Sequence, residues 1–82
     1  MQVTIKYFAS IRESIGHASE QRETNATTLA SLRDELLATG PAYACLSRDR
    51  AVRTALGQVM TDEAALLTDG CEVAFFPPVT GG

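Results

Sequence analysis

The stretch EVAFFPPVTGG, residues 72–82, decides where the sheet of this chain ends and how the chain continues beyond it. Its first half alternates with period two, which places Phe75 on one face of a strand and Phe76 on the other. Pro77 lacks an N–H group and cannot extend an interior ladder, so the strand must end at Phe76. We therefore expect two parts, a folded domain at residues 1–76 and a flexible, extended tail at residues 77–82.

The other end of the chain predicts a strand followed by a short helix. The segment VTIKYF, residues 3–8, alternates and is rich in β-branched and aromatic side chains, which is typical of a strand. Ile11 and Ile15 fall on one helical face, and Gly16 can close that helix in the left-handed conformation. Residues 17–24 are polar, so composition favours a loop; a return strand at the sheet edge is the alternative.

The clearest element is TTLASLRDELLATGP, residues 27–41. Thr28 is a good N-cap, leucines recur on one helical face, and Gly40 with Pro41 supplies a stop. The rest of the sequence predicts a helical turn within residues 42–50, a strand at residues 52–56 and a turn at residues 68–70.

The predicted order is strand, short helix, weak strand, long helix, strand, strand. This is an α+β pattern, in which a small mixed sheet is covered on one face by a helix. If the first and last strands lie side by side and parallel at the sheet centre, the result is a β-grasp, or ubiquitin-like, fold. Such a fold would have four to five strands packed against one long helix; the pattern permits this topology without requiring it.

The composition of the tail predicts a thin, extended segment that projects from the domain. Pro77 and Pro78 favour polyproline II geometry, and β-branched residues after them favour extension. Gly81 and Gly82 carry no side chain, so the α-carboxylate of Gly82 can enter a narrow active site and be activated there as a mixed anhydride with a nucleotide. The simpler alternative is a disordered end that happens to finish in glycines.

Composition argues against several classes of protein. The net charge of −3 and the scattered basic residues do not favour nucleic-acid binding. No signal peptide or membrane-spanning run is evident, and Cys45 and Cys71 lack metal-ligand spacing, so we expect a cytoplasmic protein with reduced thiols and no metal. His17 is expected in a surface loop. Neighbouring acidic residues, namely Asp34 with Glu35 and Asp62 with Glu63, are expected on a solvated surface.

Three segments carry a resemblance to a known family. DGCEVAFFPPVTGG, residues 69–82, strongly resembles the C-terminus of the molybdopterin synthase small subunit, the MoaD family of sulfur carriers. IKYFASIRESIG, residues 5–16, is similar to the opening of that family, and TLASLRDEL, residues 28–36, is similar to its long helix. The resemblance implies a β-grasp carrier without catalytic groups or a bound cofactor of its own.

The resemblance also implies a reaction and its partners. An activating enzyme of the MoeB family uses ATP to adenylate the terminal glycine, and sulfur from a persulfide donor then replaces the adenylate to leave a thiocarboxylate. The carrier docks its tail into the large subunit, of the MoaE family, typically within a heterotetramer. There it donates sulfur to cyclic pyranopterin monophosphate during molybdenum cofactor biosynthesis.

Residue roles are implied by the same resemblance. Gly82 would carry the sulfur, and Gly81 would allow the tip to thread. Phe75 and Phe76 would divide between the core and the docking surface, although alternation alone does not say which is which. The residues expected to line the partner's channel are Pro77, Pro78, Val79 and Thr80.

Two departures from the family pattern stand outside the tail. Cys71 occupies a position that is usually acidic, and Gly57 replaces an asparagine in what we expect to be a central strand. The alternatives to the molybdenum pathway are a sulfur carrier for thiamine synthesis or tRNA thiolation, a ubiquitin-like modifier that is conjugated to proteins, and an interaction domain with an inert tail.

Overall fold

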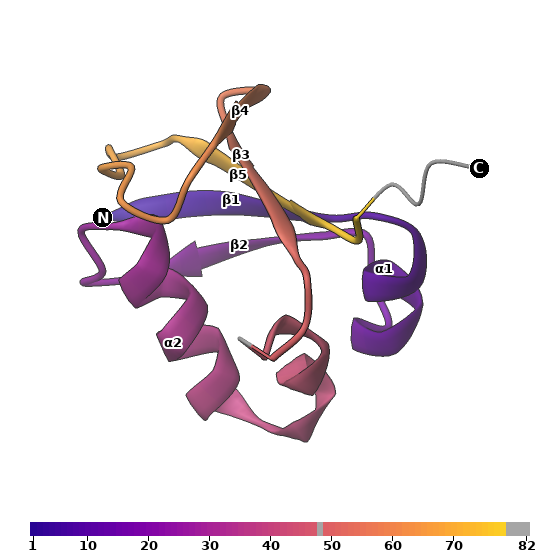
Figure 1. Ribbon diagram of the computed structural model, residues 1–82. Coiled ribbons are helices and arrows are strands. Elements are labelled where there is room, and N and C mark those ends of the chain that lie inside the picture. The colour runs from indigo at the N-terminus through magenta and orange to yellow at the C-terminus, as the bar shows by residue number, and fades with distance from the viewer. Residues whose placement is uncertain (48, 79–82) are drawn as a thin grey trace.

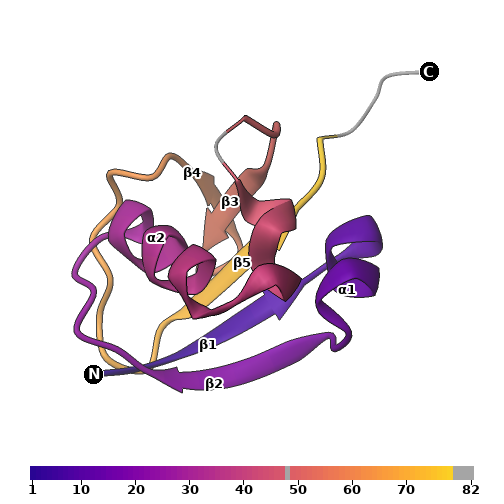
Figure 2. The same ribbon diagram turned by 90° about the horizontal axis from the view of Figure 1, so that it is seen from below.

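A computed structural model of the chain describes residues 1–47 and 49–78. Five strands form one mixed sheet in the order β2-β1-β5-β3-β4, and the helices lie on one side of it (Figures 1 and 2). In chain order the elements are β1 (Gln2–Tyr7), α1 (Ala9–Ile15), β2 (Ser19–Glu23), α2 (Leu29–Thr39), the 3-10 helix η1 (Pro41–Leu46), β3 (Arg53–Leu56), β4 (Val59–Thr61) and β5 (Glu72–Phe76). Within the described parts of the chain, none of the helices has the length and apolar character that crossing a bilayer requires.

The first and last strands lie side by side at the sheet centre. β1 pairs in parallel with β5, with Ile5 opposite Val73 and Tyr7 opposite Phe75. The predicted β-grasp fold is therefore confirmed, with five strands. The predicted strand end at Phe76 is also confirmed. Pro77 comes next, and it has no N–H group to donate to a neighbouring strand. Val79–Gly82 of the predicted tail lie outside the described residues.

The polar segment after α1 forms the edge strand β2, antiparallel to β1. The strand alternative was therefore correct and the loop was not. Glu20 and Arg22 are half-buried, whereas Ser19, Gln21 and Glu23 are exposed. The alternation is real, but its inward members are charged, so a search for apolar residues could not find it.

A short strand, β4, was not predicted. Gly57 and Gln58 both have positive φ, 58° and 68°, and join β3 to β4 in a tight hairpin with Leu56 opposite Val59. Two central residues with positive φ are typical of a type I′ turn. The expectation that Gly57 lies in a central strand was therefore wrong: it lies in a turn, where glycine tolerates the left-handed conformation.

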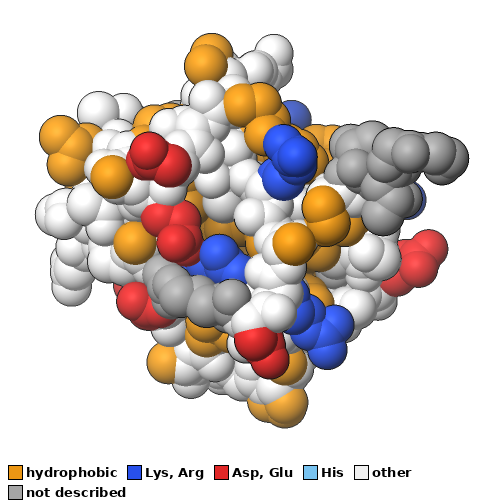
Figure 3. All heavy atoms as spheres, in the orientation of Figure 1, with side chains coloured by type: hydrophobic (Ala, Val, Ile, Leu, Met, Phe, Trp, Pro, Cys, Tyr) orange, Lys and Arg blue, Asp and Glu red, His pale blue; other side chains and the backbone are white. Residues whose placement is uncertain are grey.

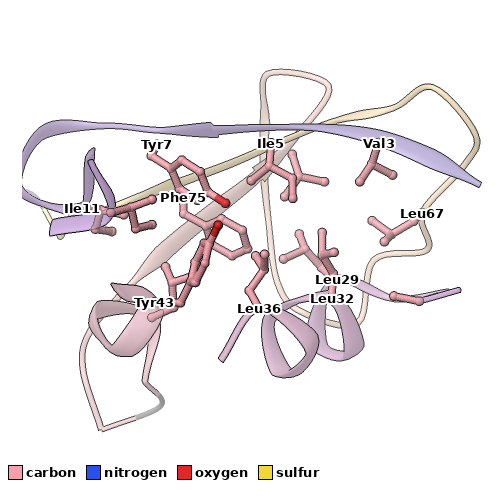
Figure 4. Close-up of a cluster of buried hydrophobic side chains, with 14 residues drawn as sticks. Val3, Ile5, Tyr7, Ile11, Leu29, Leu32, Leu36, Tyr43, Leu67 and Phe75 are labelled. Atoms are coloured by element: carbon pink, nitrogen blue, oxygen red, sulfur yellow. The ribbon is translucent and has the colours of Figure 1, made fainter. Parts of the chain in front are cut away.

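The long helix α2 provides one half of the core. Its N-cap is Thr28, which accepts a hydrogen bond from the Ser31 N–H at 3.2 Å as part of a capping box. Leu29, Leu32 and Leu36 are fully buried against the sheet (Figure 4). Each such leucine contributes about 1.5–3 kcal/mol relative to an exposed one. The predicted cap and leucine face are both confirmed.

Candidate functional site

The two consecutive phenylalanines at the end of β5 have different environments. Phe75 is 0% exposed and packs with its ring nearly parallel to that of Tyr7, at a centroid distance of 6.3 Å and an interplanar angle of 14° (Figure 4). Phe76 points to the other face of the sheet and is half-buried. The structure thus decides what alternation left open, since Phe75 belongs to the core and Phe76 to the surface.

Phe76 forms a partly exposed apolar pair with Phe8, a residue that sequence reasoning did not select. Phe8 is 45% exposed, and the two rings meet edge to face at 6.1 Å and 86°. Phe8 follows the end of β1, the strand parallel to β5, which explains why residues so far apart in sequence meet here. We call this pair the Phe8–Phe76 patch. A partly exposed aromatic pair at the surface of a small domain is typical of a binding surface.

Basic residues lie at and near this patch. Arg53 is directly opposite Phe76 in the β3–β5 register and is exposed. Lys6 lies on β1 and forms an ion pair with Glu72 at 3.2 Å. Figure 3 shows hydrophobic and basic side chains gathered on this face of the molecule, toward the end of β5.

A cleft lies at the base of the tail. Pro77 is half-buried and Pro78 is exposed, and both line a cleft of about 260 Å³. Its remaining walls come from α1, η1 and the segment before β3: Ser10, Ile11, Ser14, Cys45, Arg50, Ala51 and Val52. The base of the tail therefore lies between the cleft and the Phe8–Phe76 patch. Val79, Thr80, Gly81 and Gly82, the other predicted site residues, lie outside the described residues, and their roles stay predictions.

A partly buried hydrogen-bond cluster lies beneath this end of the sheet. Glu20 of β2 accepts hydrogen bonds from the hydroxyl of Tyr7 at 2.6 Å and from that of Tyr43 at 3.1 Å. Burial raises the pKa of Tyr7, and the hydrogen bond to Glu20 raises it further. His17 is exposed, as predicted, and its Nε2 lies 3.2 Å from Glu20. Because the Tyr7 ring packs on Phe75, the cluster helps fix the strand that ends in the tail.

The carboxylates of α2 and the loop after β4 are less solvated than expected. Glu35 pairs with Arg22 and also accepts a hydrogen bond from the Thr24 hydroxyl at 2.7 Å. Glu63 pairs at 3.1 Å with Arg33, whose guanidinium is buried and also donates to backbone carbonyl oxygens at the end of η1. For these two carboxylates the expectation of a purely solvated surface was wrong.

The two cysteines of the chain do not form a disulfide with each other. Cys45 and Cys71 are free and partly buried, and burial raises the pKa of the Cys45 thiol. Among residues 1–47 and 49–78, no three His, Cys, Asp or Glu side chains gather as metal ligands would.

Comparisons with known proteins agree with this geometry. Residues 5–82 match the ThiS family. The chain is 35% identical to the molybdopterin synthase sulfur carrier subunit of Escherichia coli (strain K12) over 80 residues, which cover 98% of this chain and 99% of the relative. The resemblance found in the sequence is thereby confirmed.

Solved structures share the fold. SAMP1 from Haloferax volcanii superposes with a TM-score of 0.82 at 22% identity, with all of both chains covered. A chain from the complex of subunits 1 and 2 of molybdopterin-converting factor from Helicobacter pylori 26695 gives a TM-score of 0.71 at 24% identity, again with both chains fully covered. At these identities the structures establish the β-grasp fold.

Proposed function

Because the chain belongs to the ThiS family, we propose that it is the sulfur-carrier subunit of a molybdopterin synthase. The observation that carries this proposal is the similarity over 98% of the chain to a relative named for that role. The family match also extends to Gly82, the residue that would carry the sulfur.

In the proposed reaction the α-carboxylate of Gly82 is first made electrophilic. A carboxylate needs a good leaving group, which an activating enzyme of the MoeB family would supply by adenylation with ATP. The outer sulfur of a persulfide donor would then attack the adenylate and release AMP, which leaves Gly82 joined to the donor through an acyl disulfide. A thiol would cleave this S–S bond, forming a new disulfide with the donor's sulfur and leaving a thiocarboxylate on Gly82. The thiocarboxylate would donate its sulfur to cyclic pyranopterin monophosphate. We expect the carrier itself to bind no cofactor. We also expect it to work in the cytoplasm.

The structure supports a division of labour between the carrier and its partners. The rigid end of β5 and the two prolines hold the start of the tail at one end of the domain, and the Phe8–Phe76 patch gives a partner an apolar surface beside it. In the proposal Pro77, Pro78, Val79 and Thr80 line the channel of a MoaE-family large subunit. That subunit supplies the catalytic groups within a heterotetramer, and Gly81 lets the tip thread.

The proposal is tested by the intact mass of the protein after incubation with its organism's activating enzyme, ATP and a sulfur source. We expect the mass gain of one sulfur replacing one oxygen. Deleting Gly82, or adding one alanine after it, should abolish the gain while the circular dichroism spectrum stays unchanged. No gain on the intact chain, with an enzyme that activates a control carrier, contradicts the proposal.

The pathway is tested separately by reconstitution. The loaded carrier and its organism's large synthase subunit should together convert cyclic pyranopterin monophosphate to molybdopterin. Sulfur loading without that conversion, together with capture of a thiazole synthase or a tRNA-thiolating enzyme, would assign the carrier to another sulfur pathway. High-mass lysine adducts on a denaturing gel would instead indicate a protein modifier.

A further inference from the structure

The arginines near the base of the tail differ from three of the other basic residues and resemble Arg12, which has no ion-pair partner among the described residues either. Lys6, Arg22 and Arg33 each form an ion pair with a carboxylate. Arg50 and Arg53 form no ion pair with any of the residues that the structure describes, although the chain as a whole is acidic, with a net charge of −3. Their positive charge is therefore not neutralised within the described part of the molecule.

Both arginines flank the point where the tail leaves the sheet. Arg50 lines the 260 Å³ cleft together with Pro77 and Pro78. Arg53 is the cross-strand neighbour of Phe76, so its side chain leaves the sheet on the same face, beside the Phe8–Phe76 patch. Arg53 also borders a second hollow, which Asp62 and Glu63 line, but it forms no ion pair with either of them. A partner that encloses the base of the tail must meet both arginines.

The cleft beside Arg50 is suited to receive a polar side chain. The hydroxyl residues Ser10 and Ser14 are one helical turn apart on α1 and line the same cleft as Arg50. A guanidinium presents several N–H donors in a planar fork that matches a carboxylate. Carboxylate oxygens can therefore accept hydrogen bonds from groups that the carrier leaves available here.

We propose that Arg50 and Arg53 form an electrostatic docking surface for acidic side chains of the activating enzyme, at the mouth of the site that admits the tail. This inference rests on the proposed function and identifies the chemistry by which one of its partners is recognised. Exposed charge pairs mainly accelerate association and are screened by salt, whereas buried apolar contacts slow dissociation. The activating enzyme must bind and release the carrier each time the tail is loaded, so fast association through exposed charges suits this partner. The apolar Phe8–Phe76 patch is the surface proposed above for the large subunit.

The test is the association rate constant of the full-length carrier with its organism's activating enzyme, measured by stopped flow across a salt series. The variant R50E/R53E should associate about five- to tenfold more slowly at low salt, because electrostatic steering changes on-rates by about tenfold or more. The difference should shrink toward about 0.5–1 M salt, where the Debye length falls to a few ångströms. The variant R50K/R53K keeps the charge and should keep most of the rate.

A control places two negative charges, half the charge change of R50E/R53E, at the far end of the domain. N25E/T27E places two new carboxylates at exposed positions in the loop before α2 and should change the rate less than twofold at any salt concentration. If R50E/R53E behaves like this control, or if R50K/R53K loses the rate as R50E/R53E does, the docking surface is refuted. A wild-type chain that gains no sulfur refutes the proposed function itself, whereas normal loading with no arginine effect refutes only this inference.

Discussion

Phe75 and Phe76 are chemically identical neighbours on one strand, yet they belong to two different regions. Phe75 is enclosed between the sheet and the helical layer and touches Tyr7, while Phe76 meets the exposed Phe8 on the opposite face of the sheet. One face of β5 thus stabilises the domain, and the other is available to a partner. Because both residues lie immediately before Pro77, the tail starts from a rigid core and beside an exposed apolar surface. Substitutions on the two faces should therefore have separable effects.

The largest effect is expected from Phe75→Ala. Removing a fully buried phenylalanine leaves a cavity and should lower the free energy of unfolding by about 3–5 kcal/mol. Urea denaturation followed by circular dichroism measures the loss, and Phe76→Ala is the matched control, with an expected loss below about 1 kcal/mol. Equal losses in the two variants would mean that the two faces are not energetically distinct.

The next effect is expected from Tyr7→Phe, which tests the hydrogen-bond cluster beneath Phe75. The change keeps the ring against Phe75 but removes the hydroxyl that donates to Glu20 at 2.6 Å. A hydrogen bond to a charged group contributes about 1.5–3 kcal/mol, and we expect a loss of stability in this range. Tyr43→Phe should cost less, because its hydroxyl donates over a longer distance of 3.1 Å. If Tyr7→Phe were as stable as the wild type, the cluster would not stabilise this end of the domain.

On the exposed face, Phe76→Ala should weaken binding of the large subunit that the proposed function implies. Loss of an aromatic anchor at an interface typically costs about 2 kcal/mol, equivalent to a Kd about thirtyfold higher. Isothermal titration calorimetry measures this change, and Leu66→Ala serves as a control because Leu66 is 70% exposed but lies away from β5. If both variants bind as the wild type does, the Phe8–Phe76 patch is not the docking surface.

The same comparison shows what the sequence could and could not predict. Alternation located β1 and β5, and the leucine spacing located α2, because these patterns depend only on local geometry and burial. Alternation could not say which phenylalanine is buried, since period two fixes opposite faces but not which one meets the core. β2 escaped a firm assignment because its inward residues, Glu20 and Arg22, are charged and are paired by groups distant in sequence. The Phe8–Phe76 contact and the position of Arg53 beside it likewise depend on strand pairing and register, which no single segment encodes.

The smallest effect concerns the ion pair of Arg22 and Glu35, which links β2 to α2 and has a predictable pH dependence. Burial opposes ionisation of Glu35, but hydrogen bonds from Thr24 and Arg22 outweigh it and hold the pKa of its carboxyl below the ordinary value. A carboxyl whose pKa is lower in the folded state contributes stability above its unfolded pKa, and this stability is lost as the pH falls through the folded pKa. Glu35→Gln should therefore lower the free energy of unfolding by about 0.5–1 kcal/mol at neutral pH, and the gap to the wild type should close below about pH 4. Urea titrations from neutral pH to about pH 3 measure the gap, with Glu13→Gln at an exposed position of α1 as the control. A gap that stays constant across this range would mean that ionised Glu35 does not stabilise the fold.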